Sequence, residues 1–372
     1  MKSQWIAALA GATFAYAAAA QDTGGSTVQI YGVLDSGIEH IDHVGASGAS
    51  VTRMPSLSGG QLPSRLGFRG SEDLGGGLRT IFTLESGFGV DNGNVQQGGR
   101  FFGRQAFVGM SGDWGTFTMG RHWTMVFYSM LEADVIGPAI FGLAALDNYM
   151  PQARSDKSLS YRGTFSGWTV GGTYSFGRDF APPANCPGDL TTSQCRAWSA
   201  MLKYDGANWG VAAAYDRQNN GINGGFFGQP AGTVANAGNV DRRTILDGYY
   251  KFAAGGRIGA GVIRRRFSAL PIGARSDLYF AGINYPLPGT AISIDAQILM
   301  LRDHARTDAN ATSVVLRGNY ALSRRTWLYA MLGHVGNDGN AAYAISAGEL
   351  APSGPVAGRG QTGMMVGMRH SF

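Results

Sequence analysis

The densest group of potential metal ligands in this chain is the stretch Glu39-His40-Ile41-Asp42-His43. Carboxylates and imidazoles bind a metal ion when several of them converge on one point with defined geometry. In an extended strand, however, successive side chains point to opposite faces, and these ligands alternate where a strand enters a loop. We therefore expect no metal site here, and the sequence indicates no other cofactor.

Catalytic arrangements are also missing from the sequence. None of the six histidines occurs with a serine and a carboxylate in a recognisable hydrolase motif. They are His40, His43, His122, His304, His334 and His370. No strand-glycine-helix arrangement supports nucleotide binding. We expect the protein not to be an enzyme and not to bind nucleic acid.

The composition indicates what these residues build instead. The chain of 372 residues contains 58 glycines and 11% aromatic residues, but only 15% charged residues, whereas a soluble domain usually carries about a quarter. Its mean hydropathy is −0.07, which is too low for a bundle of membrane-spanning helices. Low charge with neutral hydropathy favours strands that face lipid on one side and water on the other, as in a transmembrane barrel.

The first 20 residues are typical of a secretory leader. Lys2 supplies the positive charge, Trp5–Ala18 a short apolar stretch, and Ala18–Ala20 the small residues before a cleavage point. The stretch is too short for a membrane anchor, and no other stretch approaches the roughly 18 consecutive apolar residues of a spanning helix. We predict a signal peptide over 1–20 that is removed. The mature domain over 21–372 then has a net charge of about +4, because +5 loses Lys2 alone.

Export to an oxidising compartment gives the two cysteines a structural role. Cys186 and Cys195 lie nine residues apart in a segment rich in Pro, Gly, Thr and Ser. Metal binding would need more ligands than the neighbouring sequence provides. We predict a disulfide that closes one loop.

Hydrophobicity alternates along most of the mature chain in segments of about ten residues, separated by short and long connections in turn. The short connections contain the Gly, Asp, Asn and Pro residues that tight hairpins demand. They lie near 74–77, 112–115, 165–167, 204–208, 253–256, 286–289 and 323–325. The longer connections lie near 41–63, 91–99, 125–153, 179–196, 218–240, 268–275, 303–311 and 337–359.

Seven turns and eight loops join sixteen strands, with both chain ends on the turn side. The expected strands are 27–40, 64–74, 78–90, 100–112, 115–124, 155–165, 168–178, 197–205, 209–217, 241–252, 257–267, 276–285, 290–302, 312–322, 326–336 and 360–372. One face is apolar in most of them, as with Trp209, Val211 and Tyr215, whereas 278–285 and 326–334 show no clean alternation. We predict an all-β fold, a 16-stranded antiparallel transmembrane β-barrel.

Several stretches of the chain are specific enough to compare with a known family: Ile30–Asp35, Ser64–Leu78, Leu84–Phe88, Phe102–Met110 with Gly120-Arg121, and Val366–Phe372. They resemble the trimeric general porins of Gram-negative bacteria, above all the β-proteobacterial branch. The resemblance spans the mature chain. It implies a homotrimer in the bacterial outer membrane, in contact with its lipid and lipopolysaccharide. Ions and small hydrophilic solutes would diffuse passively through a water-filled pore.

The resemblance also assigns roles to particular segments. The third long loop, here 125–153, would fold into the barrel and narrow the pore, while the second, 91–99, would contact a neighbouring subunit. Unusually apolar residues such as Ile140-Phe141-Gly142-Leu143 support the inward path, because an external loop would expose them to water. The C-terminal aromatic residue, here Phe372, would be the signal that the barrel-assembly machinery reads.

A porin selects solutes at a constriction, where charges on opposite sides of the pore set a transverse field. By match to the family, the basic side is formed by Arg65, Arg104 and Arg154 on the wall. The acidic side is offered by Glu132, Asp134 and Asp147 on the third loop. Alternation supports Arg65, since Leu66 and Phe68 occupy the opposite face. For Arg104 it is equivocal, so a place at the rim or at the subunit interface stays open.

Two departures from the family bear on ion preference. The loop proline, Pro138, is followed by Ala139 and Ile140, where an acidic residue is common, and Val33 stands where some relatives have lysine. The loss of a loop carboxylate leaves the arginines less compensated, and the net charge is positive. We therefore predict a mild anion preference.

Alternative functions are a substrate-specific outer-membrane channel, an outer-membrane barrel enzyme such as a phospholipase, and an adhesin that works through its loops. The enzyme lacks a catalytic motif, and the loops are moderate in length without a plug domain. The run Arg264-Arg265-Arg266 lies at the loop-side end of its strand. It either forms a solvated rim or contacts lipopolysaccharide phosphates.

Overall fold

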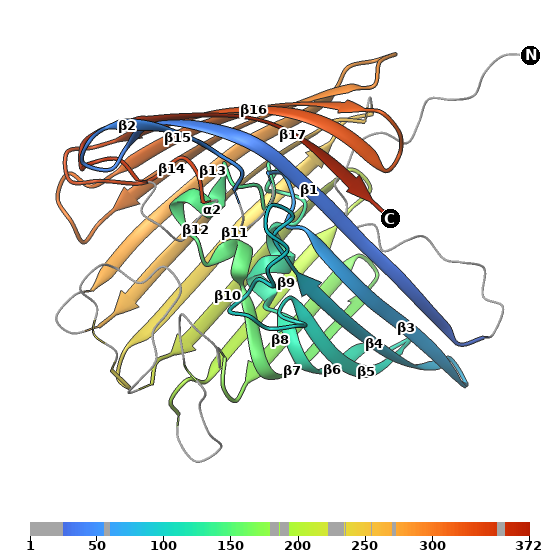
Figure 1. The fold of residues 1–372 in the computed structure, drawn as a ribbon. Coiled ribbons are helices and arrows are strands. Elements are labelled where there is room, and N and C mark those ends of the chain that lie inside the picture. Colours follow the sequence, from blue (N-terminus) through green and yellow to red (C-terminus); the bar gives the residue numbers. More distant parts are fainter. Residues whose placement is uncertain are drawn as a thin grey trace, which may run out of the picture.

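A computed structural model of the chain describes residues 25–55, 60–178, 186, 193–221, 234, 236–253, 255–269, 273–347 and 354–372. The predicted leader over 1–20 lies outside these residues. Within the described ranges the chain forms a sheet that closes on itself (Figure 1). No helix in this part of the chain combines the length and apolar character needed to cross a membrane.

The wall of the barrel consists of long antiparallel strands. They are β1 (Thr27–Val44), β3 (Arg65–Gly75), β4 (Leu78–Gly87), β5 (Gln105–Gly112), β6 (Gly115–Trp123), β7 (Arg154–Phe165), β8 (Trp168–Ser175), β9 (Ala197–Asp205), β10 (Trp209–Asn219), β11 (Val240–Lys251), β12 (Arg257–Ser268), β13 (Ala274–Pro286), β14 (Ile292–Asp303), β15 (Ala311–Ala321), β16 (Thr326–Asn337) and β17 (Gln361–Ser371). This confirms the predicted sixteen-stranded antiparallel barrel, with strand ends that differ from the prediction by a few residues.

The first strand closes the barrel. Residues 27–33 of β1 pair with β3, and residues 33–41 pair with β17, so one long strand joins the beginning of the sheet to its end. The sheet also contains a strand that was not predicted, β2 (Ala49–Arg53), which pairs with the loop-side end of β1. It is short and lies inside the predicted loop 41–63, where the sequence has no long alternating segment.

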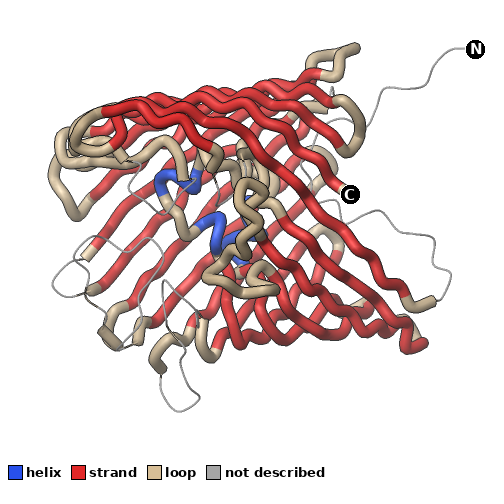
Figure 2. The backbone as a smooth tube through the Cα atoms, viewed as in Figure 1, coloured by secondary structure: helices blue, strands red, loops and turns tan. Residues whose placement is uncertain are grey.

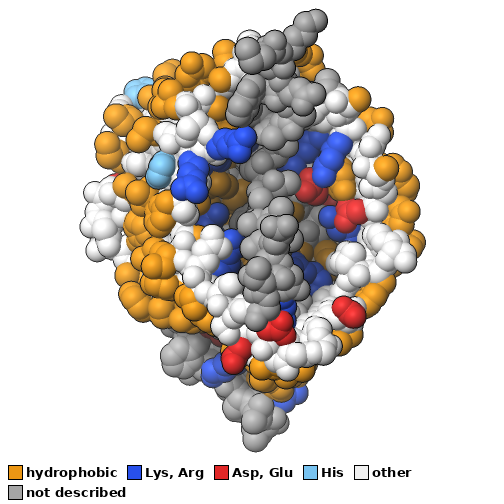
Figure 3. Space-filling view, turned by 90° about the vertical axis from the view of Figure 1, so that its right-hand side faces the viewer, with side chains coloured by type: hydrophobic (Ala, Val, Ile, Leu, Met, Phe, Trp, Pro, Cys, Tyr) orange, Lys and Arg blue, Asp and Glu red, His pale blue; other side chains and the backbone are white. Residues whose placement is uncertain are grey.

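Side chains alternate between the two faces of the wall. Aromatic residues gather at both ends of the strands, as expected at membrane interfaces. Near the turns, the ring of Tyr204 lies 4.9 Å from that of Trp168 and 5.3 Å from that of Trp209. At the loop end, Trp198 lies 4.8 Å from Tyr215. The end view in Figure 3 shows apolar side chains around the circumference and arginine and lysine side chains within the ring.

The strands without a clean alternation in sequence, β13 and β16, do alternate in the structure. In β13, Tyr279 and Ile283 are exposed on the outer face, whereas Leu278 and Phe280 are buried inside. Both faces are apolar because the inner face is covered by protein instead of water. Leu278 and Phe280 belong to one hydrophobic cluster with residues of the third loop.

The third loop lies inside the barrel, as predicted. It contains α1 (Met125–Met130), α2 (Leu143–Leu146) and the short 3-10 helix η1 (Met150–Gln152), and Figure 2 shows the helices within the ring of strands. Ile136, Ile140 and Phe141 of this loop are almost fully buried. The hydrophobic core of the protein is therefore the contact between this loop and the inner wall of the barrel.

Candidate functional site: the charged lumen

The third loop crosses the lumen and is attached to several strands on its way. The backbone amide of Met125 donates to Ser199 on β9 at 2.9 Å. Farther along, the amide of Ile136 donates to Gln297 on β14 at 2.9 Å, and Arg317 on β15 donates to the Ile136 carbonyl at 2.8 Å. These polar contacts, together with the apolar cluster, fix the path of the loop from β6 toward the far wall.

Glycines on the last two strands make room for the loop. A Cβ at Gly363 on β17 would lie 2.8 Å from the ring of Phe141, and a Cβ at Gly333 on β16 would lie 3.2 Å from it. Real Cβ atoms rarely approach so closely, and a ring in a packed core cannot move aside without cost. Glycine at these two positions therefore leaves the space in which the apolar middle of the loop packs against the wall.

The strongest charged contact of the loop is made by Asp147. The Nε and Nη2 atoms of Arg243 on β11 donate to its two oxygens at 2.8 and 3.0 Å. Burial alone would raise the pKa of the Asp147 carboxyl, but the contacts with Arg243 outweigh it and hold the pKa below its ordinary value. Asp147 is thus an anionic anchor of the returning arm of the loop.

The other two predicted loop acids have different partners. Glu132 accepts from Arg257 on β12 at 3.1 Å and lies 3.3 Å from the Lys251 ammonium on β11. Asp134 makes no ion pair with an arginine among the described residues and instead accepts from the side-chain amide of Gln297 at 3.0 Å. Its burial raises its pKa to about 6, an increase that the hydrogen bond from Gln297 only partly offsets.

The predicted basic residues gather on the opposite side of the lumen, around one carboxylate. Glu85 on β4 accepts from the Nε atom of Arg104 at 2.7 Å and lies 3.5 Å from the Nε atom of Arg65. Arg104 precedes β5, whose first residue is Gln105, so the strict alternation of a strand does not determine its direction. Arg104 is 2% exposed, and its side chain reaches Glu85, which turns it away from the outer surface.

Arg154, at the start of β7, is held by an aromatic ring. Its guanidinium carbon lies 3.4 Å from the ring centroid of Trp123, and that of Arg104 lies 5.5 Å from the same ring. Trp123 in turn stacks on Phe127 of α1 at 3.7 Å. Cation–π contacts of this kind stabilise a desolvated cation without neutralising it. Two nitrogens of Arg154, Nε and Nη2, are buried without a hydrogen-bond partner among the described residues.

The structure therefore brings Arg65, Arg104 and Arg154 together, and it does not bring the loop acids into contact with them. Trp123 was not predicted as part of the site. The sequence signal that could have found it is its place directly after the Gly120-Arg121 segment, at the start of the third loop.

Comparison with known proteins agrees with this architecture. Residues 6–340 match the sequence family described as Gram-negative porin. The chain belongs to this family. An outer membrane porin protein of Bordetella pertussis is 33% identical over 312 residues, which are 79% of this chain and 75% of the relative. The outer membrane porin protein 32 of Delftia acidovorans is 28% identical over 363 residues, 93% and 94% of the two chains.

A solved structure has the same fold. The anion-selective porin from Comamonas acidovorans superimposes with a TM-score of 0.76 at 24% identity, and the alignment covers 93% of this chain and 100% of that one. The protein is accordingly an outer-membrane porin of the Gram-negative type, a channel and not an enzyme, as predicted.

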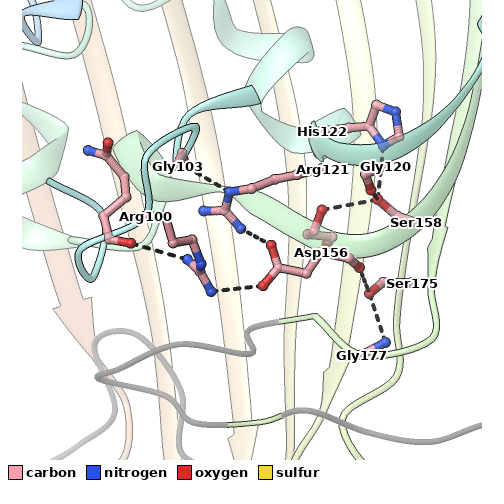
Figure 4. A network of polar contacts seen from close by, with 11 residues as sticks. Arg100, Gly103, Gly120, Arg121, His122, Asp156, Ser158, Ser175 and Gly177 are labelled. Carbon is pink, nitrogen blue, oxygen red and sulfur yellow. Dashed lines mark hydrogen bonds and ion pairs between the residues drawn. The ribbon is translucent and has the colours of Figure 1, made fainter. Parts of the chain in front are cut away.

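The second loop of this porin spans 88–104 in the structure, between β4 and β5, and it helps to position the arginine cluster of Arg65, Arg104 and Arg154. Asp156 on β7 accepts from Arg100 of that loop at 2.8 Å and from Arg121 on β6 at 2.5 Å (Figure 4). Arg121 also donates to the carbonyl of Gly103 at 2.7 Å. Because Gly103 directly precedes Arg104, this hydrogen bond fixes the bend that turns Arg104 toward Glu85.

A second inward-facing set of arginines was missed by the sequence analysis. Arg257, Arg317 and Arg369 line the cavity on the turn side of the third loop. The inward direction of Arg369 could have been predicted, because Met368 and Phe372 face outward and Arg369 lies at the opposite parity of the same strand. Arg317 is used structurally, because it bonds Asp295 at 2.7 Å as well as the loop backbone.

The first loop also enters the porin lumen. The backbone amides of Gly60, Gln61 and Leu62 donate to the carboxylate of Asp35 on β1 at 2.9, 3.1 and 2.8 Å. The side chain of Gln61 contacts Asn319 on β15. Residues 60–62 were predicted only as part of a long loop, and nothing in the local sequence indicates that they line the pore.

The remaining chemical candidates serve structure. Cys186 and Cys195 form a disulfide, with their Cα atoms 5.3 Å apart. Glu39 accepts from Arg53 at 2.6 Å and from Ser346 at 2.8 Å, whereas His40 contacts Thr52 at 2.8 Å. No group of three or more potential metal ligands occurs in the described part of the chain.

Proposed function

We propose that this porin is a general diffusion channel with a mild preference for anions. The observation that carries the proposal is the uneven pairing of charges in the lumen. Arg65 and Arg104 both contact the carboxylate of Glu85, whereas Arg154 lies on the Trp123 ring and makes no ion pair with a carboxylate of the described residues.

The loop acids do not restore the balance. Asp147 and Glu132 are each bonded to cations on β11 and β12, and Asp134 contacts Gln297 instead of the arginine cluster. The excess positive charge of Arg65, Arg104 and Arg154 over Glu85, although buried in the wall, then biases the pore toward anions, because the field of a narrow, low-dielectric opening acts on every ion that passes. The described anion selectivity of the Comamonas acidovorans porin, which shares the fold, supports the same sign.

The test is the reversal potential of the purified full-length protein in planar bilayers under a KCl gradient. We expect a potential of the sign that chloride selectivity gives, of modest size. Glu85→Gln should increase it and Arg154→Gln should decrease it. Clear cation selectivity of the unaltered protein would contradict the proposal.

A substrate-specific channel is the second candidate, and one observation favours it. Residues 60–62 occupy the lumen together with the third loop, which reduces the cross-section left for diffusion. Single-channel conductance during titration with small organic anions separates the two functions. A general porin shows a current that rises linearly with salt and is blocked weakly by all of them, whereas a specific channel saturates with one solute.

We propose further that the porin assembles as a homotrimer through its second loop. Phe101 is 68% exposed and Val90 is 43% exposed on that loop, an apolar surface that another subunit would cover. A related fold, the OmpT protein of Vibrio cholerae, has been solved in a trimer form, with a TM-score of 0.66 at 15% identity over 94% of this chain. Native mass spectrometry of the protein and of Phe101→Ser tests this, and a monomeric unaltered protein would refute it.

The two chain ends complete the proposal. We propose that residues 1–20 are removed on export and that Phe372 is read by the barrel-assembly machinery. The backbone of Phe372 exchanges hydrogen bonds with Gly32 at 3.0 and 3.1 Å, and its ring is 44% exposed on the outer face. Mass spectrometry should find Gln21 at the mature N-terminus. Phe372→Ser should reduce the amount of folded barrel in the outer membrane while leaving refolding in detergent intact.

A further inference from the structure

A row of four arginines crosses four adjacent strands on the outside of the barrel. Arg217 on β10 is directly opposite Arg242 on β11, Arg242 is opposite Arg266 on β12, and Arg266 is opposite Arg275 on β13. Neighbouring strands lie about 4.8 Å apart, so the four Cα atoms span roughly 15 Å. We call these four residues the arginine row.

The rows of paired residues below it place the arginine row at the edge of the lipid-facing surface. Four residues along each strand from the arginine row, on the side of the short turns, Leu246 is opposite Val262, and Val262 is opposite Tyr279. Leu246 is 60% exposed and Tyr279 is 41% exposed, so this lower row is apolar and faces outward. Because pairs on one face recur every second residue, the arginine row faces outward as well, at the loop-side end of the strands.

The loop-side aromatic belt gives the height of the row. Tyr215, which lies beside Trp198, precedes Arg217 by two residues, which is about 7 Å along a strand. Tyr and Trp mark the boundary between hydrocarbon and head groups. The arginine row therefore lies at the level of the head groups of the outer leaflet.

The positive charge of the row is not neutralised by the protein. Like charges directly opposite each other destabilise a sheet. The nearby carboxylate on this face, Asp277, is occupied by Arg264 at 2.7 and 3.1 Å and by His304 at 3.1 Å. Within the described residues, the side chains of Arg242, Arg266 and Arg275 make no hydrogen bond or ion pair with another side chain. Arg266 and Arg275 are also exposed.

We propose that the arginine row binds the phosphate groups of a phosphorylated glycolipid of the outer leaflet, the lipid A part of lipopolysaccharide. Guanidinium groups bind phosphate through two parallel hydrogen bonds, and an anion between facing arginines removes their repulsion. The apolar row of Leu246, Val262 and Tyr279, which is separated from the arginine row by one polar row, would receive the acyl chains of the same molecule. This combination distinguishes a lipid from free phosphate, which has no use for the apolar surface.

A neighbouring subunit is a less suitable occupant. The proposed trimer contact is on the second loop, between β4 and β5, and the strand order places β10–β13 on the opposite side of the ring. The inference rests on the outer-membrane location of this porin and is independent of its ion preference.

The test compares two double variants of the full-length protein purified in detergent. Arg266→Gln with Arg275→Gln removes the two exposed charges of the row. Arg306→Gln with Arg359→Gln removes two exposed charges from loops at the same end of the barrel. The probes are bisphosphorylated lipid A, its dephosphorylated form and phosphatidylcholine, and the readout is the lipid-bound fraction in native mass spectrometry.

A cation near a membrane surface strengthens the binding of anionic lipid roughly fivefold, so the row variant should bind lipid A at least about tenfold more weakly. The loop variant should stay within about twofold, and dephosphorylated lipid A should bind all proteins equally weakly. Equal lipid A affinity of both variants, or equal affinity for both lipid A forms, would overturn the proposal. Competition by inorganic phosphate alone at equal concentration would assign the row to a free anion instead.

Bilayer conductance of the same variants in synthetic lipid keeps this result separate from the proposed channel function. The row faces outward, so its loss should leave conductance and reversal potential unchanged. An altered reversal potential with unaltered lipid binding would show that the row acts on the pore and not on lipid.

Discussion

Replacing Asp147 by asparagine should loosen the third loop without changing its shape. The side chain keeps its size but loses the charge that two nitrogens of Arg243 contact at 2.8 and 3.0 Å. Both partners are buried, with 7% and 1% of their side-chain surfaces exposed. The perturbation is therefore local, isosteric and confined to the interior of the barrel.

The cost follows from the burial of the pair. Breaking a buried ion pair by removing one partner costs about 3–5 kcal/mol. Here Arg243 keeps a second carboxylate, Asp241, at 3.0 Å, so the loss should be about 2–3 kcal/mol. Since 1.4 kcal/mol corresponds to a factor of ten, the loop should leave its seat on the order of 100 times more often.

A matched substitution on the same loop separates charge from anchoring. Glu132→Gln also removes one negative charge, but Glu132 is 17% exposed, and its contacts with Arg257 and Lys251 are longer, 3.1 and 3.3 Å. A partly solvated pair of this kind is worth about 1 kcal/mol or less. Both variants should shift the reversal potential toward anions. Only Asp147→Asn should add closures and noise to single-channel records.

Single-channel recording in planar bilayers at 1 M KCl is the assay, because high salt screens the change in charge and leaves the change in anchoring. Thermal unfolding of the detergent-solubilised protein is the second measurement, and Asp147→Asn should unfold at the lower temperature. Equal closure frequencies in the two variants would refute the reasoning that the Asp147 contact holds the loop.

Three further predictions concern the lumen and the disulfide. Burial raises the pKa of Asp134 to about 6 from an ordinary value of 3.8. The protonated Asp134 carboxyl is therefore favourable for folding at low pH, and this contribution to stability is lost as the pH rises through about 6. Protonation also removes a negative charge from the lumen, so the anion preference should be stronger below pH 6 than above it. Asp134→Asn should flatten both profiles, measured by thermal unfolding and by reversal potential, and an unchanged profile would contradict this. Arg154→Gln should lower the chloride-to-potassium permeability ratio roughly two- to threefold, since a charge about 7 Å from a passing ion is worth about 0.6 kcal/mol in water. Trp123→Leu keeps that charge, so it should lower the melting temperature and leave the permeability ratio nearly unchanged. An unchanged melting temperature with an altered permeability ratio would count against the cation–π role. Finally, protein from the oxidising compartment should show no thiol at Cys186 or Cys195 until it is unfolded and reduced, and labelling before reduction would show that the disulfide does not form.

The strands were predictable because their signal is local. A strand has a period of two, and each residue such as Trp209 or Tyr215 reports its own face whatever the rest of the chain does. Turns are likewise encoded by a few neighbouring residues, as in Gly75-Gly76-Gly77. Alternation was not visible in 278–285, because Leu278 and Phe280 face a loop and not water. The third loop covers that inner face only in the folded protein, so the alternation of hydrophobic residues within one strand cannot indicate it.

The direction of Arg104 shows the same limit at the site. Its parity in the sequence was equivocal, and its direction depends on a bend that Arg121 fixes through the Gly103 carbonyl. Residues 60–62 line the lumen without a local signal for the same reason, and the contact of Trp123 with the arginines is not visible in its own segment. Their positions depend on contacts with Arg154 and Asp35, side chains presented by other strands of the wall.

By itself the sequence determined an exported chain of alternating segments, their turns, the number of strands and an apolar third loop that water would not cover. These features follow from short-range periodicity and from the free energy of exposing apolar surface. Only the tertiary structure decided which wall holds the loop, because Asp147 and Arg243 are 96 residues apart in the chain. It likewise aligned Arg242, Arg266 and Arg275 in one row. Strand register sets both arrangements, and register is a property of paired strands that no single strand contains.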